Sequence, residues 1–300
     1  MKDIYSKTTV NINGEILDAE NAKISIFDRG FLFGDSIYEV SYTSKRNILF
    51  YEEHMDRLYN SAKLLNMNIF IDRDKLTQEI LKTLKASNLD DGYFRLIITR
   101  GESEISLNPN LSTHNNFVIM VKPRPSYSNE LYIKGIDLLL SNVIRNPKNA
   151  TDPNAKSGNY LNNVMAIAEA KKKGYSDAIM VNGNGQLTEG TTFNFWIIKG
   201  NQVLTPMSDN GLLMGITRHK VLELKNIDDL EMKEAELFPK DIFEADEMFI
   251  TSSTRGVMPI SKILTNDGLK EFQSFEKTNR VANAYGQLVE NYLAESKYKY

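Results

Sequence analysis

The chain alternates between segments with strand periodicity and segments with helix periodicity, and this mixture limits its fold more than any other feature. Residues 36–43 and 47–51 are rich in β-branched and aromatic side chains, and the polar residues 44–46 between them predict a β-hairpin. Apolar residues then recur at helical spacing from Met55 to Leu65 and again between Asp74 and Ser87. The first third of the chain is therefore predicted to combine strands with amphipathic helices.

A domain boundary is predicted after two further strands, at residues 93–100 and 116–122. The segment 123–126 contains two prolines, which interrupt the strand pattern and suit a linker. We therefore expect an N-terminal domain over residues 1–126 and a C-terminal domain over residues 127–300. A chain of 300 residues that is 41% apolar is long enough for two domains of ordinary size, each with its own core.

The second part is predicted to open with a strand at residues 136–142. A polar loop follows at 146–155, and a helix from about 161 to 173 ends at a glycine. This pattern places Lys156 at a junction between loop and helix.

The sequence Asn-Gly-Asn-Gly at residues 182–185 predicts a hairpin turn, because Asn and Gly tolerate positive φ angles. The predicted strands on either side of it are 178–181 and 193–199, and Glu189 lies on the second arm. Three later elements are predicted, namely a helix from about Thr217, a strand at 247–251 and an amphipathic terminal helix around residues 281–292.

Composition disfavours several classes of function. The formal net charge is −3, and no cluster of Lys and Arg is interleaved with aromatics, so a nucleic-acid partner is not expected. With no Cys, the chain can form no disulfide or thiolate nucleophile, which suits a reducing, cytoplasmic location. Residues 1–6 lack an apolar signal core, and apolar runs such as 117–121 are too short to span a bilayer. The three histidines, His54, His114 and His219, are scattered, which disfavours a metal site.

One lysine and one carboxylate are suited to anchoring pyridoxal phosphate. Lys156 follows a polar loop, and a neutral lysine amine can form a Schiff base with an aldehyde. Glu189, in Leu-Thr-Glu-Gly, could keep the pyridine nitrogen protonated and so preserve the electron sink of the cofactor. The alternative for either residue is a solvated surface charge, since the chain carries 36 Lys and Arg and 39 Asp and Glu.

Three segments are suited to binding a phosphate: Arg57 on a predicted helix, residues 215–217 at a helix start, and residues 251–254 after a strand. Hydroxyls and backbone N–H groups at such positions bind phosphate well. The alternatives are a solvated arginine, a helix N-cap and a polar turn, respectively.

The order and spacing of these motifs resemble the class IV aminotransferases, the fold type IV group of pyridoxal phosphate enzymes, over nearly the whole chain. The stretches that carry the resemblance are Phe27–Glu39, Glu53–Leu58, Lys156 with Gly158–Tyr160, Thr188–Gly190, Gly215–Arg218 and Thr251–Thr254. The resemblance implies a small N-terminal α/β domain, a larger C-terminal α/β domain and the cofactor in the cleft.

The resemblance also implies roles for individual residues. Lys156 would form the Schiff base and shuttle the proton, Glu189 would contact the pyridine nitrogen, and Tyr160 would tune the cofactor through its phenol. For Tyr160 the competing interpretation is a core tyrosine. The residues implied as ligands of the phosphate or of the substrate carboxylate are Arg57, Ile216, Thr217, Ser253 and Thr254.

The substrate class is ambiguous between two subfamilies. Tyr93 and Arg95 share one face of a strand, and the motif Tyr-Phe-Arg-Leu resembles branched-chain aminotransferases, where an Arg suits the side-chain carboxylate of glutamate. This slightly favours branched-chain L-amino acids with 2-oxoglutarate as the keto acid. The stretches around Arg29 and Tyr38 look more like D-amino acid aminotransferases, and both residues are candidate substrate ligands. For Arg29 and Arg95 the alternative role is a salt bridge at an interface.

Two further alternatives stay open. An aminodeoxychorismate lyase would use the same lysine to eliminate pyruvate, and a degenerate family member would only bind the cofactor. The resemblance also implies at least a homodimer in which each active site receives a loop from the second subunit, and the aromatic candidates for that contact are Phe31, Phe33 and Tyr127.

Overall fold

The computed structural model describes residues 5–224, 227 and 229–300, which form two compact units. Unit 1 takes the residues up to Pro125 together with Ala155–Asn159 and Asn291–Tyr300, and unit 2 takes Ser126–Asn154 and Tyr160–Glu290. The segment that carries Lys156 thus groups with the N-terminal unit. The domain boundary between residues 126 and 127 stays a prediction. Residues 1–4, part of the stretch predicted to lack a signal core, lie outside the described residues.

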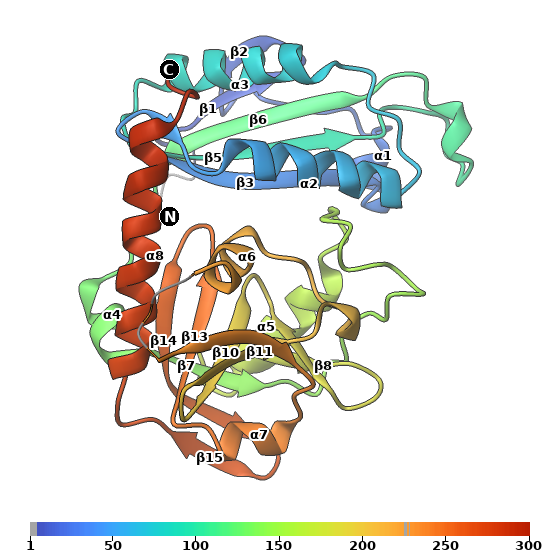
Figure 1. Cartoon of the computed structure of the whole chain (residues 1–300). Coiled ribbons are helices and arrows are strands. Elements are labelled where there is room, and N and C mark those ends of the chain that lie inside the picture. The colour runs from blue at the N-terminus through green and yellow to red at the C-terminus, as the bar shows by residue number, and fades with distance from the viewer. Residues whose placement is uncertain (1–4, 225–226, 228) are drawn as a thin grey trace. The chain divides into compact units, whose positions relative to one another are not determined.

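Among its described residues, unit 1 forms an antiparallel sheet of six strands with two long helices packed on it (Figure 1). Its elements are β1 (Thr9–Ile12), β2 (Glu15–Asp18), α1 (Arg29–Phe33), β3 (Ser36–Ser44), β4 (Asn47–Ile48), α2 (Tyr51–Leu64), α3 (Arg73–Ser87), β5 (Gly92–Thr99), the 3₁₀ turn η1 (Pro109–Leu111) and β6 (Asn116–Pro123). The strand order is β2-β1-β6-β5-β3-β4. Helix α2 packs on β3, and α3 packs on β1, β5 and β6.

The core of unit 1 lies between this sheet and the two helices, and β5 shows which face is buried. Its alternate residues Phe94, Leu96 and Ile98 are buried in the same apolar cluster as Leu58 of α2 and Ile80 of α3. The intervening residues of β5, Tyr93, Arg95 and Ile97, are only half-buried and point to the opposite face. Strand β5 therefore carries the site candidates Tyr93 and Arg95 on the face of the sheet away from the helices.

The predicted hairpin is confirmed between β3 and β4. Ser44 pairs with Asn47, so Lys45 and Arg46 form a two-residue turn with φ angles of 50° and 63°. The second strand is shorter than predicted, because Phe50 adopts a left-handed conformation with φ of 48° and α2 begins at Tyr51.

Unit 2 forms a mixed sheet of nine strands in the part of the chain that the structure describes. Its elements are α4 (Asn129–Lys134), β7 (Ile136–Leu140), α5 (Leu161–Lys172), β8 (Asp177–Val181), β9 (Leu187–Gly190), β10 (Asn194–Lys199), β11 (Gln202–Pro206), the 3₁₀ turn η2 (Ser208–Asn210), α6 (Ile216–Leu222), β12 (Glu231–Ala235), α7 (Pro239–Phe243), β13 (Glu247–Ser252), β14 (Gly256–Thr265), β15 (Gly268–Glu271) and α8 (Glu276–Glu295), of which the residues from Asn291 onward group with unit 1. The strand order is β12-β11-β10-β13-β14-β7-β8-β9, and β15 pairs with β14.

One predicted pairing in unit 2 is wrong. The predicted strand at residues 193–199 corresponds to β10, which pairs with β11 and β13 rather than forming an arm of the hairpin with β8. The second arm is β9, a separate short strand that includes Glu189 and pairs antiparallel with β8. The chain turns sharply between β9 and β10, where Gly190 N–H donates to Phe193 O and the Phe193 ring fills the space that a Cβ on Gly190 would need.

The core of unit 2 is built mainly from the central strands. The Trp196 ring of β10 stacks on Phe249 of β13 with ring centroids 5.6 Å apart, and both side chains are fully buried. The buried carboxylate of Glu247 accepts hydrogen bonds from the backbone N–H groups of Lys277 and Thr278, which ties the start of α8 to the sheet. No helix in the described ranges is long and apolar enough to cross a membrane.

The orientation of the β5 side chains predicts how substitutions in this strand change the free energy of unfolding. Leu96→Ala removes a fully buried side chain beneath the helices and should lower the free energy of unfolding by about 2–5 kcal/mol, because it leaves a cavity. Ile97→Ala on the opposite face is the matched control and should cost less. Urea unfolding of both variants checks this, and equal losses would mean that the core face of β5 has been assigned wrongly.

Candidate functional site

The segment that carries Lys156 is attached to β3 by its backbone. Tyr38 N–H donates to Lys156 O at 2.9 Å, Gly158 N–H donates to Ser36 O at 2.8 Å, and Ile37 forms a bridge with Ser157. Lys156 therefore does not begin a helix, since α5 starts only at Leu161. It lies in a short segment that runs alongside β3 and pairs with it through the antiparallel bridge between Ile37 and Ser157.

Lys156 and Arg95 both contact the ring of Tyr38. Lys156 Nζ donates to Tyr38 Oη at 3.3 Å and lies 4.4 Å from the ring centroid, and the Arg95 guanidinium carbon lies 4.0 Å from it. Cations are attracted to the face of an aromatic ring, so Tyr38 holds both groups near one place. Tyr93 lies two residues before Arg95 on the same face of β5. Unit 1 thus brings together the predicted catalytic lysine and three of the predicted substrate ligands.

Arg57 is paired with a buried carboxylate that the sequence analysis did not single out. Glu39 Oε1 accepts from Arg57 Nε at 2.6 Å, and Glu39 Oε2 accepts from Arg57 Nη2 at 2.8 Å. His54 Nδ1 lies 2.7 Å from the same Oε2. These residues lie on β3 and on one face of α2, where positions three apart are neighbours.

The charges of this cluster follow from its burial. Burial alone would raise the pKa of Glu39, but the charge and hydrogen bonds of Arg57, together with those of His54, lower that pKa from 4.5 to about 2. Burial lowers the pKa of His54 below 6.5, although Glu39 opposes this change. At neutral pH the cluster therefore contains a carboxylate, a guanidinium and a neutral imidazole that donates its Nδ1–H to Glu39.

Arg29 is buried inside unit 1. Its Nε donates to Asp35 at 3.0 Å, its Nη1 donates to Ser106 O at 2.6 Å, and the guanidinium lies 5.1 Å from the Phe33 ring. Arg29 therefore fastens the start of α1 to the loop around Ser106. Its role as a substrate ligand stays a prediction.

Glu189 is fixed from two sides within unit 2. Its Oε1 accepts from Arg145 Nε at 2.9 Å, and its Oε2 accepts from the backbone N–H of Leu213 at 3.1 Å. Arg145 Nη1 in turn donates to Asn162 Oδ1 at 3.1 Å. Both charged side chains are nearly buried, with 7% of Glu189 and 10% of Arg145 exposed. The carboxylate predicted to face a pyridine nitrogen is thus held in one orientation.

The start of α6 fits an anionic group. Ile216 and Thr217 form the first turn of this helix, where backbone N–H groups have no acceptor within the helix. Thr217 Oγ1 is buried and has no hydrogen-bond partner among the described residues. A buried hydroxyl of this kind needs an acceptor, and a phosphate oxygen would provide one. These residues therefore fit the phosphate of pyridoxal phosphate.

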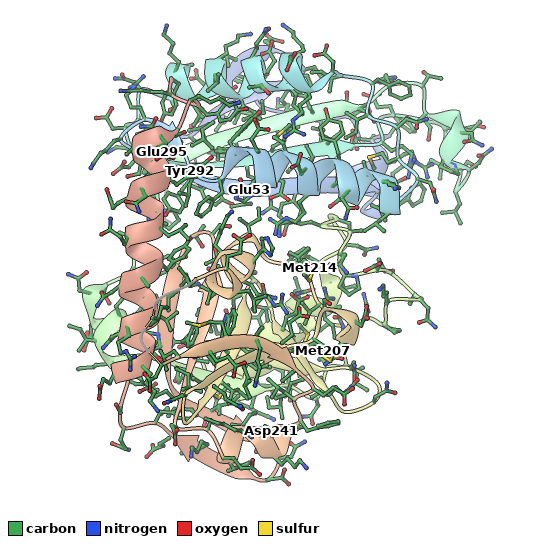
Figure 2. The ribbon with its side chains drawn as sticks, viewed as in Figure 1. Glu53, Met207, Met214, Asp241, Tyr292 and Glu295 are labelled. Carbon is green, nitrogen blue, oxygen red and sulfur yellow. The ribbon has the colours of Figure 1, made fainter. Side chains whose placement is uncertain are left out.

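Buried contacts hold α6 in place. The fully buried Arg218 donates through Nη2 to Pro206 O at 2.7 Å and to Glu234 at 2.5 Å. Met214, which is labelled in Figure 2, precedes α6 in the sequence and donates its backbone N–H to Asn154 Oδ1 at 3.2 Å. Gly215, directly before the first residue of α6, has no room for a Cβ, because that atom would collide with the Asn194 side chain.

The remaining unit 2 candidates are half-buried. Ser253 and Thr254 lie in the turn after β13, and Tyr160 directly precedes α5. The partial exposure of Tyr160 differs from that of a fully buried core tyrosine. The predicted roles of all three side chains stay predictions.

The candidates therefore fall into two sets, one in each unit. Unit 1 carries Arg29, Tyr38, Arg57, Tyr93, Arg95 and Lys156, and unit 2 carries Tyr160, Glu189, Ile216, Thr217, Ser253 and Thr254.

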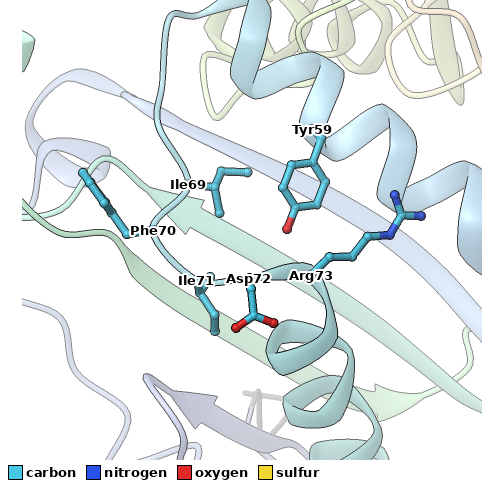
Figure 3. A pocket seen from close by; sticks show the side chains of 6 residues that line it. All are labelled: Tyr59, Ile69, Phe70, Ile71, Asp72 and Arg73. Atoms are coloured by element: carbon cyan, nitrogen blue, oxygen red, sulfur yellow. The ribbon is translucent and has the colours of Figure 1, made fainter.

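A pocket of about 370 Å³ lies elsewhere in unit 1, between α2 and the start of α3, and is lined by Tyr59, Ile69, Phe70, Ile71, Asp72 and Arg73 (Figure 3). No candidate residue lines it.

The residues that hold the candidates in place were not predicted from the sequence. Glu39 and His54 lie inside two of the stretches that carry the family resemblance, so their charge and spacing to Arg57 were available as a signal. Arg145 ends the segment before a predicted loop and carried no such signal. Its contact with Glu189 joins positions 44 residues apart.

The Glu39 cluster predicts a pH dependence of stability. Because folding lowers the pKa of Glu39 from 4.5 to about 2, its contribution is fully present above pH 4.5 and is lost as the pH falls toward 2. Glu39→Gln should therefore flatten the acid side of the unfolding curve between pH 4.5 and 2. Thermal unfolding across this range checks it against Glu104→Gln, an exposed control, and equal acid slopes for both variants would contradict it.

The Arg145–Glu189 pair predicts a second effect. Arg145→Met leaves the Glu189 charge buried without its partner and should lower the free energy of unfolding by about 3–5 kcal/mol. The double variant Arg145→Met with Glu189→Gln should recover part of that loss. A double-mutant cycle from urea unfolding measures the coupling, and simple additivity would mean that the two side chains do not interact.

Comparisons with known proteins show the family of the chain. The family model described as amino-transferase class IV matches residues 36–263. A Methanocaldococcus jannaschii protein, provisionally named a branched-chain-amino-acid aminotransferase, is 34% identical over 254 residues, which cover 85% of this chain and 87% of that one. The branched-chain-amino-acid aminotransferase of Escherichia coli K12 is 28% identical over 281 residues, covering 91% and 90% of the two chains.

The fold is also similar to that of a solved branched-chain aminotransferase. The crystal structure of a branched-chain aminotransferase from Thermoproteus uzoniensis, determined with norvaline, superposes with a TM-score of 0.86 at 26% identity and covers 97% of this chain and 96% of that one. The mixed α/β architecture of the two units is thus that of the fold type IV aminotransferases. The chain belongs to the class IV aminotransferase family.

Proposed function

We propose that this aminotransferase uses pyridoxal phosphate to move an amino group between a branched-chain L-amino acid and 2-oxoglutarate. The observation that carries the proposal is the cluster of Lys156, Tyr38 and Arg95. It places a lysine amine and a guanidinium suited to binding a carboxylate at the same tyrosine ring. The named relatives support the amino-acid class. The Thermoproteus uzoniensis structure contains norvaline, an apolar amino acid with an unbranched side chain.

The residues that would hold the cofactor come from both sets. Arg57, Ile216 and Thr217 would bind its phosphate, and the buried hydroxyl of Thr217 supports this assignment. Ser253 and Thr254 would add hydroxyl donors for the phosphate or the substrate carboxylate. Tyr160 would donate a hydrogen bond from its phenol hydroxyl to the cofactor ring.

When bound, pyridoxal phosphate supplies the aldehyde that takes up the amino group and the ring that withdraws electrons from the substrate Cα–H bond. Lys156 Nζ would accept the α-proton and later return it, and its hydrogen bond to Tyr38 Oη orients the amine for that transfer. The Glu189 carboxylate, held by Arg145 and Leu213 N–H, would keep a proton on the ring nitrogen. Arg95 would bind the side-chain carboxylate of glutamate, with Tyr93 beside it.

Lys156→Ala should abolish transamination while the protein still folds. Removal of a proton-transfer group costs about 10²- to 10⁴-fold in rate, and this lysine would also anchor the cofactor. Amino transfer from L-leucine to 2-oxoglutarate is the assay, with circular dichroism as the folding check. Lys148→Ala is the matched control, because Lys148 is an exposed lysine paired with Asp209 at 3.1 Å. Full activity of the Lys156 variant would contradict the mechanism.

The visible absorption of the cofactor-loaded protein distinguishes the substrate classes. L-leucine and L-glutamate should bleach the band of the lysine-bound cofactor, whereas D-alanine and D-glutamate should leave it unchanged. Bleaching by the D pair alone would make the protein a D-amino acid aminotransferase, with the carboxylate contact elsewhere than Arg95. Pyruvate release from aminodeoxychorismate without any keto acid would identify the lyase instead.

We also propose that the protein is at least a homodimer, and that it works in the cytoplasm. Phe31 is 65% exposed, and the apolar side chains of Phe27, Ile105 and Leu107 are exposed as well. Arg29 ties α1 to the loop carrying the last two, so these side chains lie on connected segments of one unit. Phe33 and Tyr127 are half-buried and contact cations of their own units, Arg29 and Arg255 respectively.

Sedimentation velocity tests the dimer. Phe31→Ser should shift the protein toward monomers and lower its activity together, because a second subunit would complete the site. A fully active monomer would contradict the shared site. Phe70→Ser is the control, since Phe70 is also exposed but lies at the pocket beside α3.

A further inference from the structure

Arg57 is held by two hydrogen bonds to the buried carboxylate of Glu39. We propose that Glu39, supported by His54, is a positioning residue that fixes the Arg57 guanidinium for the phosphate of the cofactor. The inference rests on the proposed function, because it assumes that Arg57 binds that phosphate. It adds that Glu39 acts on cofactor affinity only through the phosphate group.

The geometry of the pair sets the orientation of the guanidinium. Two hydrogen bonds, from Nε at 2.6 Å and from Nη2 at 2.8 Å, join Arg57 to the two oxygens of Glu39. A bidentate contact of this kind fixes the plane of the guanidinium as well as its distance. His54 Nδ1, at 2.7 Å from Oε2, restricts the carboxylate in the same way.

The exposed fractions of the three side chains show from which side a ligand can reach the cluster. The side chains of Glu39 and His54 are 2% and 3% exposed, whereas that of Arg57 is 12% exposed. A ligand can therefore approach the cluster through Arg57 rather than through its two supports. A buried ion pair is weak evidence for a stabilising role, since a well-packed apolar replacement is often as stable. Placement of a charged group is a better explanation of this pair.

The cluster is also connected to the catalytic lysine. Ser61 Oγ donates to Arg57 O at 2.8 Å, and Lys156 N–H donates to Ser61 Oγ at 3.1 Å. Glu39 directly follows Tyr38 on β3, and successive residues of a strand point to opposite faces. Strand β3 thus presents Tyr38 to Lys156 on one face and Glu39 to Arg57 on the other.

Positioning and electrostatics predict opposite effects of removing the Glu39 charge. Glu39 is negative, so by charge alone it repels a phosphate, and Glu39→Gln would strengthen phosphate binding. If Glu39 positions Arg57, the same change lets the guanidinium rotate, and ordering it again on binding weakens the affinity. Glu39→Asp keeps the charge but shortens the side chain, so positioning predicts weaker binding there too.

The experiment compares pyridoxal phosphate with pyridoxal, which lacks the phosphate, as ligands of the full-length apoprotein. Dissociation constants are measured by equilibrium dialysis. The Kd of pyridoxal divided by the Kd of pyridoxal phosphate reports the contribution of the phosphate. Glu39→Gln should reduce this ratio about tenfold or more while the affinity for pyridoxal stays the same. In a protein that already carries Arg57→Met, the same change should have no further effect on the ratio.

The inference is overturned by tighter binding of pyridoxal phosphate by Glu39→Gln, by equal weakening for both ligands, or by an effect that persists with Arg57→Met. If Glu39→Gln does not fold, as judged by thermal unfolding, Glu39→Asp decides by the same ratio. A wild-type protein that binds no pyridoxal phosphate would instead contradict the proposed function. Wild-type binding with a ratio insensitive to both substitutions would contradict only the role of Glu39.

Discussion

The backbone pairing between residues 156–158 and β3 is the contact on which the unit 1 site depends. Two hydrogen bonds, Tyr38 N–H to Lys156 O and Gly158 N–H to Ser36 O, attach a segment from far along the chain to the N-terminal sheet. The attachment favours glycine at 158, because a Cβ there would come too close to Ser36 Oγ and the Ser36 side chain would have to move. It brings the amine of Lys156 to the Tyr38 ring, where Arg95 also lies.

Each unit follows the same design, in which a buried ion pair orients a group suited to a ligand. Glu39 holds Arg57 in unit 1, and Arg145 holds Glu189 in unit 2. A charge without its partner would be costly at such depth, and the hydrogen bonds of each pair also restrict the rotamers of its two side chains. Arg218 has the corresponding role for the backbone, since it fastens the helix that begins with Ile216 and Thr217.

Local patterns in the sequence predicted the helices, strands and turns that depend on contacts between residues close in the chain. The helices α2 and α3, the strands β5 and β6 and the hairpin at Lys45 follow from periodicity and turn chemistry. The error at β10 arose because a turn signal does not identify the partner strand when a short strand such as β9 intervenes. The role of Lys156 was predicted from its motif and stays a prediction. Its hydrogen bond to Tyr38 spans 118 positions, and no local periodicity encodes a contact of that range.

The most direct test of the account is to reduce the cofactor-loaded protein with sodium borohydride and to locate the label by peptide mass spectrometry. Borohydride turns a lysine–cofactor linkage into a stable amine, so the labelled peptide identifies the lysine. We expect a phosphopyridoxyl group on Lys156 of the wild-type protein and no such label in the Lys156→Ala variant. A label on any other lysine, or none on the loaded wild-type protein, would contradict the central claim.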